Sequence, residues 1–97
     1  MDVNYEQNGN LFTWDSDKAE LNWRKHGVRF EEAASVFGDP LLVLVDAPRN
    51  DEARDAAIGF DATGRLLYVV HIEFELECVR LISARRATVE EENRYVD

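Results

Sequence analysis

The side chains best suited to chemistry in this sequence gather on one predicted helix, over residues 16–26. At about 100° per residue, Lys18, Asn22 and Lys25 form one ridge of that helix, with Trp23 and His26 beside it. Apolar residues flank the ridge, so two lysines and an amide point toward the protein body or the rim of a cleft. Such a set of cations and hydrogen-bond donors is suited to binding an anion.

Arginines on the predicted strands extend this set of cations. Arg54 shares the strand parity of Ile58, and Arg85 shares that of Leu81, so both should project from a largely apolar face near an end of the sheet. A guanidinium there needs an anion, which is either an internal carboxylate or a phosphate. In a simple meander the two arginines lie toward opposite ends of the sheet, where they would hold different phosphates. Lysine, arginine and one histidine would suffice to cleave RNA through attack by its own 2′-hydroxyl, since guanidinium groups stabilise the charge that develops on phosphorus.

Several of these side chains also have a purely structural interpretation. His26 is a candidate general acid or base, but in the last turn of a helix it is also favoured by the helix dipole. Trp14 and Trp23 could each stack a nucleobase or anchor the core. Glu91 as a catalytic base competes with a role in a capping box, and Glu73 is a second candidate proton carrier.

Length and composition indicate one small domain. A chain of 97 residues that is 45% hydrophobic can bury a modest single core. The lone Cys78 is interpreted as a small buried hydrophobic residue, and His71 as a hydrogen-bonded core histidine. With no apolar run near 18 residues and no N-terminal signal, we predict a cytoplasmic protein that neither enters a membrane nor is exported. Two histidines and one cysteine make a poor zinc site, so metal-independent chemistry and no cofactor are expected.

The net charge of −9 limits the choice of partners. It argues against general binding to polyanions, although a local cationic cleft can exist on an acidic protein. An acidic surface also suits a basic protein partner. An alternative function is therefore a non-catalytic acidic binding module that pairs with a basic partner, and a weaker one is mimicry of nucleic acid.

The hydrophobic pattern predicts an α+β domain of order β-α-α-β-β-β-β-α, with an antiparallel sheet and the helices packed on it. Residues 1–10 are expected to be a flexible tail and 11–97 the folded domain. A glycine hairpin loop is predicted at 62–64, and the strand over 65–73, apolar on both faces, should be central. The predicted strands cover residues 11–14, 41–45, 54–60, 65–73 and 77–85, and the predicted helices cover 16–26, 30–37 and 88–96.

Four segments together resemble the BrnT family of bacterial toxins. The matching patterns are F-x-W-D-x-x-K-x-x-x-N-x-x-K-H-G-V-x-F-E-E-A from Phe12 to Ala33, E-x-R-x-x-x-I-G from Glu52 to Gly59, G-R-L-L from Gly64 to Leu67, and R-L-I-S-A-R-R-A-T-x-x-E from Arg80 to Glu91. The resemblance covers about residues 12–95, and its motifs are specific in combination.

This resemblance implies a RelE-like ribonuclease fold and a toxin that cleaves RNA without a metal ion and so arrests translation. It also implies neutralisation by a BrnA-type antitoxin that carries a DNA-binding segment, in a 2:2 complex that represses its own operon, so that DNA is contacted only through the complex. The predicted catalytic residues are Lys25, His26, Arg54 and Arg85, with Lys25, Arg54 and Arg85 on the phosphate. The predicted RNA-binding residues are Trp14, Lys18, Asn22, Arg65, Arg80 and Arg86.

Overall fold

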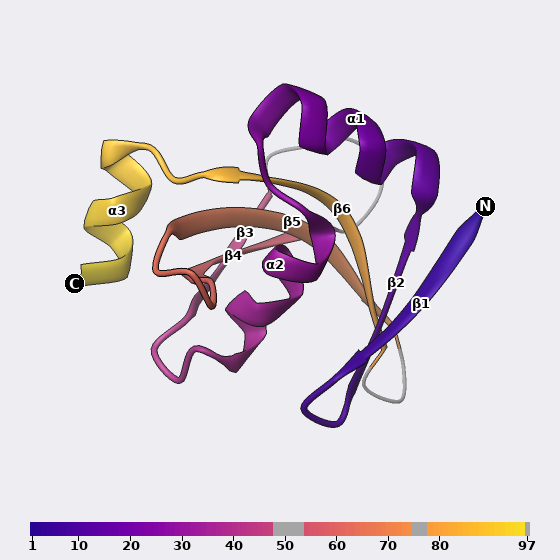
Figure 1. The fold of residues 1–97 in the computed structure, drawn as a ribbon. Helices are drawn as coiled ribbons and strands as arrows, with labels where there is room; N and C mark the ends of the chain where they lie inside the picture. The colour runs from indigo at the N-terminus through magenta and orange to yellow at the C-terminus, as the bar shows by residue number, and fades with distance from the viewer. Residues whose placement is uncertain (48–53, 75–77, 97) are drawn as a thin grey trace.

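A six-stranded sheet of order β1-β2-β6-β5-β4-β3 forms the body of the computed structural model, which describes residues 1–47, 54–74 and 78–96 (Figure 1). The strands are β1 (Asp2–Gln7), β2 (Asn10–Asp15), β3 (Val43–Asp46), β4 (Asp55–Phe60), β5 (Leu66–Phe74) and β6 (Cys78–Arg86). The α+β class and the central place of β5 are confirmed. The sheet is mixed, however, because the meander from β3 to β6 returns β6 alongside β2 in a parallel direction.

The first ten residues are not the tail that the sequence predicted. They form β1, which pairs with β2 from Asp2 to Gln7, and a tight turn at Asn8 and Gly9. Both turn residues have left-handed backbone, with φ of 51° and 83°, as a two-residue hairpin turn requires. Burial alternates along β1, a period-two pattern that the sequence analysis missed.

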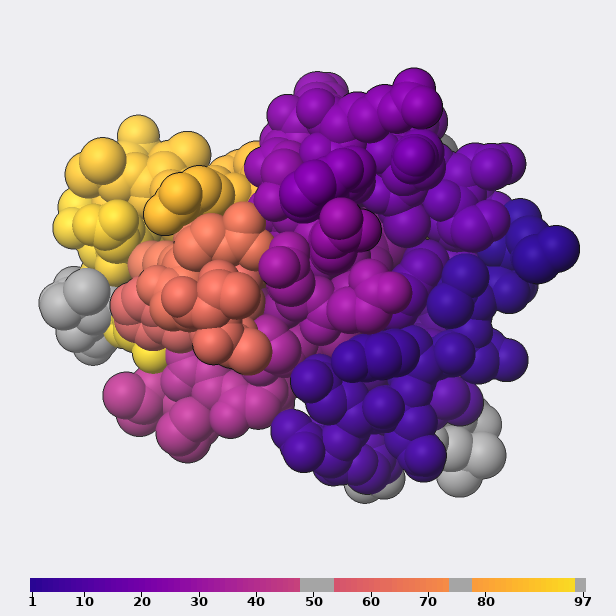
Figure 2. Space-filling model, viewed as in Figure 1, coloured from indigo at the N-terminus to yellow at the C-terminus, as the bar shows by residue number. Residues whose placement is uncertain are grey.

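The described residues also form three α-helices and one 3-10 turn: α1 (Ser16–His26), α2 (Phe30–Ser35), η1 (Val36–Gly38) and α3 (Val89–Val96). The bounds of α1 agree with the predicted range 16–26. Asp15 caps its start, where the carboxylate accepts a hydrogen bond from the Lys18 N–H at 3.1 Å, and left-handed Gly27 ends it. In the space-filling view α1 and α2 cover one side of the molecule, with the β1–β2 hairpin at its border (Figure 2). Within the described ranges, no helix has both the length and the apolar character needed to span a membrane.

The core lies between the sheet and the helices α1 and α2, with Phe12, Phe30, Leu67 and Val69 almost fully buried. His71 is also fully buried, as predicted, with its ring edge-on to Phe37. Its hydrogen bonds are only half satisfied: Nδ1 lies 3.2 Å from the Val69 carbonyl oxygen, and Nε2 has no partner among the described residues. Cys78 is half-buried at the start of β6, so it is more exposed than predicted.

A β-bulge decides which way the end of β6 faces. Its pairing with β5 shifts by one residue at Ile82, and this reverses the alternation of side chains. Ala84 therefore shares the buried face with Leu81, whereas Arg85 lies on the opposite face over Tyr68. The predicted common parity of Arg85 and Leu81 is wrong for this reason.

Candidate active site

Asn22 fixes the position of α1 on the sheet. Its Nδ2 donates to the carbonyl oxygens of Val28 at 3.0 Å and Ala84 at 2.9 Å, and its Oδ1 accepts from the Ala84 N–H at 3.0 Å. Only 7% of Asn22 is exposed, and both amide donors are used. We therefore assign Asn22 a positioning role in place of the predicted RNA contact, because this clamp holds the last turn of α1 beside the end of β6.

The last turn of α1 carries three consecutive basic residues, Arg24, Lys25 and His26. Lys25 is exposed and His26 is half-buried. Burial lowers the pKa of His26 below its ordinary value of 6.5, and the positive charges of Lys25 and Arg85 lower it further. Lys25, His26 and Arg85 therefore form one electrostatic cluster, in which His26 is a neutral proton acceptor at pH 7.

Arg85 is held by a carboxylate at the start of α3. Its Nη1 and Nη2 donate to the two oxygens of Glu91, each at 2.8 Å, and Nη1 also donates to the Arg86 carbonyl oxygen at 3.1 Å. The guanidinium carbon lies 4.3 Å from the centre of the Tyr68 ring. The hydrogen bond with Arg85 lowers the pKa of Glu91, so the pair is ionised at neutral pH.

Glu91 also closes the predicted capping box of α3. It accepts a hydrogen bond from the Thr88 N–H at 2.9 Å, and its own N–H donates to Thr88 Oγ1 at 3.2 Å. One carboxylate thus both starts the helix and orients the arginine.

The Arg85–Glu91 pair leaves one edge of the guanidinium open. Arginine has five N–H donors, and the three hydrogen bonds above use two on Nη1 and one on Nη2. The two that remain, on Nε and Nη2, lie side by side, and 35% of the side chain is exposed. Such an edge has the fork geometry that binds two oxygens of a phosphate.

The same count of N–H donors indicates a structural role for Arg65. Its Nε and Nη2 donate to Asp61 at 3.1 and 3.0 Å, Nη2 also donates to Glu32 at 2.8 Å, and Nη1 donates to the Gly27 carbonyl oxygen at 3.1 Å. These bonds leave no pair of adjacent N–H donors free to bind a phosphate. They connect the β4–β5 hairpin loop to the end of α1 and to α2. The structure therefore favours a positioning role for Arg65 over an RNA contact.

Two further predicted arginines lie away from the cluster. Arg54 precedes Asp55 of β4, which pairs with His71 of β5, whereas Arg85 of β6 pairs with Tyr68 of β5. The two arginines therefore belong to opposite neighbours of β5, and the paired positions differ by three residues, or about 10 Å, along that strand. Arg80, near the start of β6, donates to Asp2 at 3.1 Å and to Thr13 at 3.3 Å. The expected separation of Arg54 from Arg85 is thus observed. Glu73, the other candidate proton carrier, lies at that same far end of β5.

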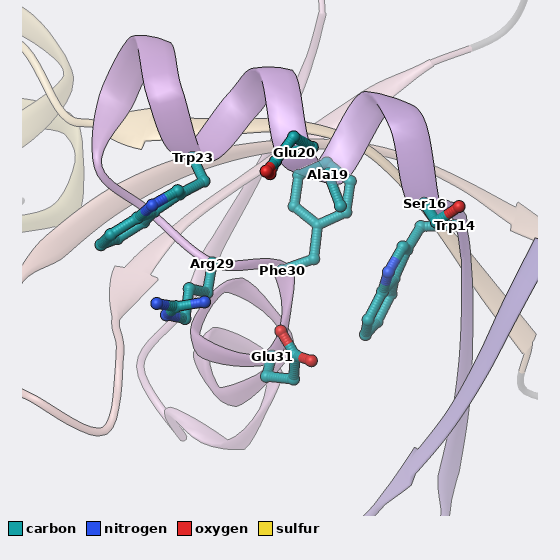
Figure 3. A pocket seen from close by; sticks show the side chains of 8 residues that line it. All are labelled: Trp14, Ser16, Ala19, Glu20, Trp23, Arg29, Phe30 and Glu31. Carbon is teal, nitrogen blue, oxygen red and sulfur yellow. The ribbon is translucent and has the colours of Figure 1, made fainter.

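The remaining predicted contacts differ in accessibility. Lys18 and Arg86 are exposed, at the first turn of α1 and the end of β6. Trp14 is 3% exposed and packs against Tyr5 and Phe30, so it is a core residue and unavailable for base stacking. Trp23 is 41% exposed and lines a pocket between α1 and α2 (Figure 3).

Sequence reasoning missed the two partners that define Arg85. The sequence patterns predict a capping or catalytic role for Glu91, without a link to Arg85, and no role for Tyr68 in the site. Arg85 and Glu91 are six residues apart, a spacing that neither helical nor strand periodicity links. The contact of Arg85 with Tyr68 depends on the position of the β-bulge, which the sequence does not indicate. Within residues 1–47, 54–74 and 78–96, no group of three or more His, Cys, Asp or Glu side chains could hold a metal ion.

Comparison with known proteins agrees with this architecture. Residues 14–91 match a family model described as the ribonuclease toxin BrnT of type II toxin-antitoxin systems. The crystal structure of the Brucella abortus ribonuclease toxin BrnT is similar, with a TM-score of 0.57 and 25% identity over 77% of this chain and 92% of that one. No curated protein matches the chain.

The fold and the family match together define a small α+β toxin domain. The chain belongs to the BrnT family of ribonuclease toxins of type II toxin-antitoxin systems. Membership of this family implies an antitoxin protein as a partner.

Proposed function

We propose that the protein is an endoribonuclease toxin that cleaves RNA without a metal ion, at the cluster of Lys25, His26 and Arg85. The observation that carries this proposal is the open Nε–Nη2 edge of Arg85, held by Glu91 beside a histidine of lowered pKa. A phosphate on this edge would lie close to one proton acceptor and one further cation.

The chemistry needs only these side chains, the substrate and water. Neutral His26 accepts the proton of a 2′-hydroxyl as its oxygen attacks the adjacent phosphorus. The bond from phosphorus to the 5′-oxygen breaks, and this oxygen takes a proton from water, leaving a 2′,3′-cyclic phosphate and a 5′-hydroxyl. Arg85 and Lys25 stabilise the charge that grows on the phosphoryl oxygens.

The proposal includes a biological setting, which the family match supports. RNA cleavage in the cytoplasm would arrest translation, and a BrnA-type antitoxin would neutralise the toxin in a 2:2 complex. That complex would repress its own operon, with the antitoxin supplying the DNA contacts. Type II membership supports this part of the proposal.

The test is cleavage of single-stranded RNA by the purified protein in the presence of EDTA. Arg85→Ala should lower the rate about 100- to 1000-fold, as loss of a transition-state donor typically does. Arg85→Lys should not restore it, because an ammonium group lacks the fork. Arg80→Ala, which removes an arginine from the far end of β6, is the matched control.

Removal of Arg85 also leaves Glu91 unpaired, so Lys25→Ala provides a second variant with an exposed position and an intact fold. It should lower the rate as well, with an unchanged thermal unfolding midpoint. Intact RNA with the wild-type protein, together with unimpaired growth on expression and retained binding to a basic partner, would instead support the non-catalytic binding module.

A further inference from the structure

A pocket of about 210 Å³ lies between α1 and α2, on the Trp23 side of α1 (Figure 3). The exposed indole of Trp23 and the guanidinium of Arg29, stacked 4.2 Å from the indole centre, form one end. The buried ring of Phe30 lies behind, and Glu20 from α1 and Glu31 from α2 extend toward each other across the opening (Figure 3). Its volume is below the roughly 300–1,000 Å³ of pockets for drug-sized ligands, so it suits one flat group.

We propose that this pocket binds a guanine base of the RNA substrate, an inference that rests on the proposed ribonuclease function. Unpaired bases are recognised by stacking on aromatic or arginine planes and by hydrogen bonds to their Watson–Crick edges. The Trp23–Arg29 stack provides the plane. Two carboxylates, those of Glu20 and Glu31, line the opening, and an ionised carboxylate acts only as a hydrogen-bond acceptor.

Guanine is the base that fits an acceptor. Its Watson–Crick edge presents two adjacent donors, N1–H and the 2-amino group, which match the two oxygens of one carboxylate. Adenine and cytosine present a ring nitrogen acceptor there, and uracil presents one donor between two carbonyl oxygens. A carboxylate therefore attracts guanine and repels the others.

Glu31 is the carboxylate to which we assign this contact. Glu20 lies 4.0 Å from Arg24 on its own helix, whereas no ion pair of Glu31 occurs within the described ranges. Glu31 is exposed and therefore accessible to a base.

The pocket is also in the right place relative to the proposed chemistry. Trp23 and His26 are three residues apart on α1, so their side chains are neighbours on one helix face, about 5–6 Å apart at Cβ. A phosphate at Arg85 and a base at Trp23 would thus belong to the same stretch of the RNA, and cleavage should occur next to guanosine.

Binding of the nucleotides 3′-GMP, 3′-IMP and 3′-AMP, followed by tryptophan fluorescence, tests the pocket without any cleavage. The dissociation constant of 3′-GMP should be about tenfold or more below those of 3′-AMP and of 3′-IMP, which lacks the 2-amino group. Glu31→Gln should abolish the difference, and Glu6→Gln, the same change on exposed β1, should preserve it. Equal binding of the three nucleotides, or selectivity that survives Glu31→Gln, would overturn the assignment.

Cleavage of RNAs that differ at one nucleotide separates this inference from the function on which it rests. Wild-type protein should cut next to guanosine, and Glu31→Gln should cut with that preference lost. Cleavage by the wild type without base preference would refute the guanine pocket and leave the ribonuclease intact. Selective binding of 3′-GMP without any cleavage would support the guanine pocket and refute the ribonuclease function.

Discussion

Arg65 and Arg85 show how the same residue type acquires different roles from its partners. Both are paired with carboxylates and neither is fully exposed. The bonds of Arg65 occupy both edges of its guanidinium, whereas those of Arg85 converge on the Nη1–Nη2 end and leave the Nε edge open. An ion pair alone therefore does not exclude a binding role for an arginine. Whether the arginine can also bind a phosphate depends on which of its N–H donors the ion pair leaves unused.

The lowered pKa of His26 predicts the pH dependence of cleavage. In the proposed mechanism the base form of His26 is the active one, so the rate should rise with pH through the pKa of His26, and this acid limb should lie below pH 6.5. Replacing Lys25 with methionine removes a nearby positive charge, so the limb should move to higher pH. The measurement is the cleavage rate between pH 4.5 and pH 8.5, a range of about four units that brackets the ordinary histidine value.

His26→Gln is the complementary variant. It should lower the rate about 100- to 10,000-fold, as loss of a general base does, and remove the limb. A limb that persists at the same pH in His26→Gln would assign the titration to another group.

The contact of α1 with β6 depends on one amide. Asn22→Ala would leave the Ala84 N–H and two carbonyl oxygens buried without partners, which should reduce the free energy of unfolding by about 2–5 kcal/mol. Leu21→Ala, a change on the same helix at a position 63% exposed, should alter it by less than about 0.5 kcal/mol. Urea unfolding measures both, and a loss below about 1 kcal/mol in Asn22→Ala would contradict the clamp.

Local signals predicted most of the elements. The helix over 16–26 and the capping box of Glu91 each depend on residues that are close in sequence, and the structure confirms both. The parallel pairing of β2 with β6 and the bulge at Ile82 depend on contacts between distant segments, to which hydrophobic periodicity is insensitive. The candidate site follows the same rule: local signals predict the range of the helix that carries Lys25 and His26, whereas the orientation of Arg85 depends on the bulge and could not be predicted.

An acidic protein that binds RNA must keep its cations together. Of the described arginines, Arg65 and Arg80 are engaged in ion pairs away from the cluster, while Lys25, His26 and Arg85 form it. Lys18 lies on the same ridge of α1, seven residues or about 10 Å from Lys25, and could contact a second phosphate. With so few such contacts on a chain of net charge −9, we expect the affinity for RNA to be modest and to depend only weakly on salt.

This arrangement predicts the salt dependence of RNA affinity. Three phosphate contacts, by Lys18, Lys25 and Arg85, should give a slope of about −2 for the logarithm of the association constant against the logarithm of salt concentration, at about −0.7 per contact. The measurement uses a 2′-O-methylated oligonucleotide, which cannot attack its own phosphate. Lys18→Ala should make the slope shallower by about 0.7, whereas Arg80→Ala, about 17 Å from Arg85 along β6, should leave it unchanged. Equal effects of the two substitutions would mean that RNA responds to net charge alone, without a localised cationic site.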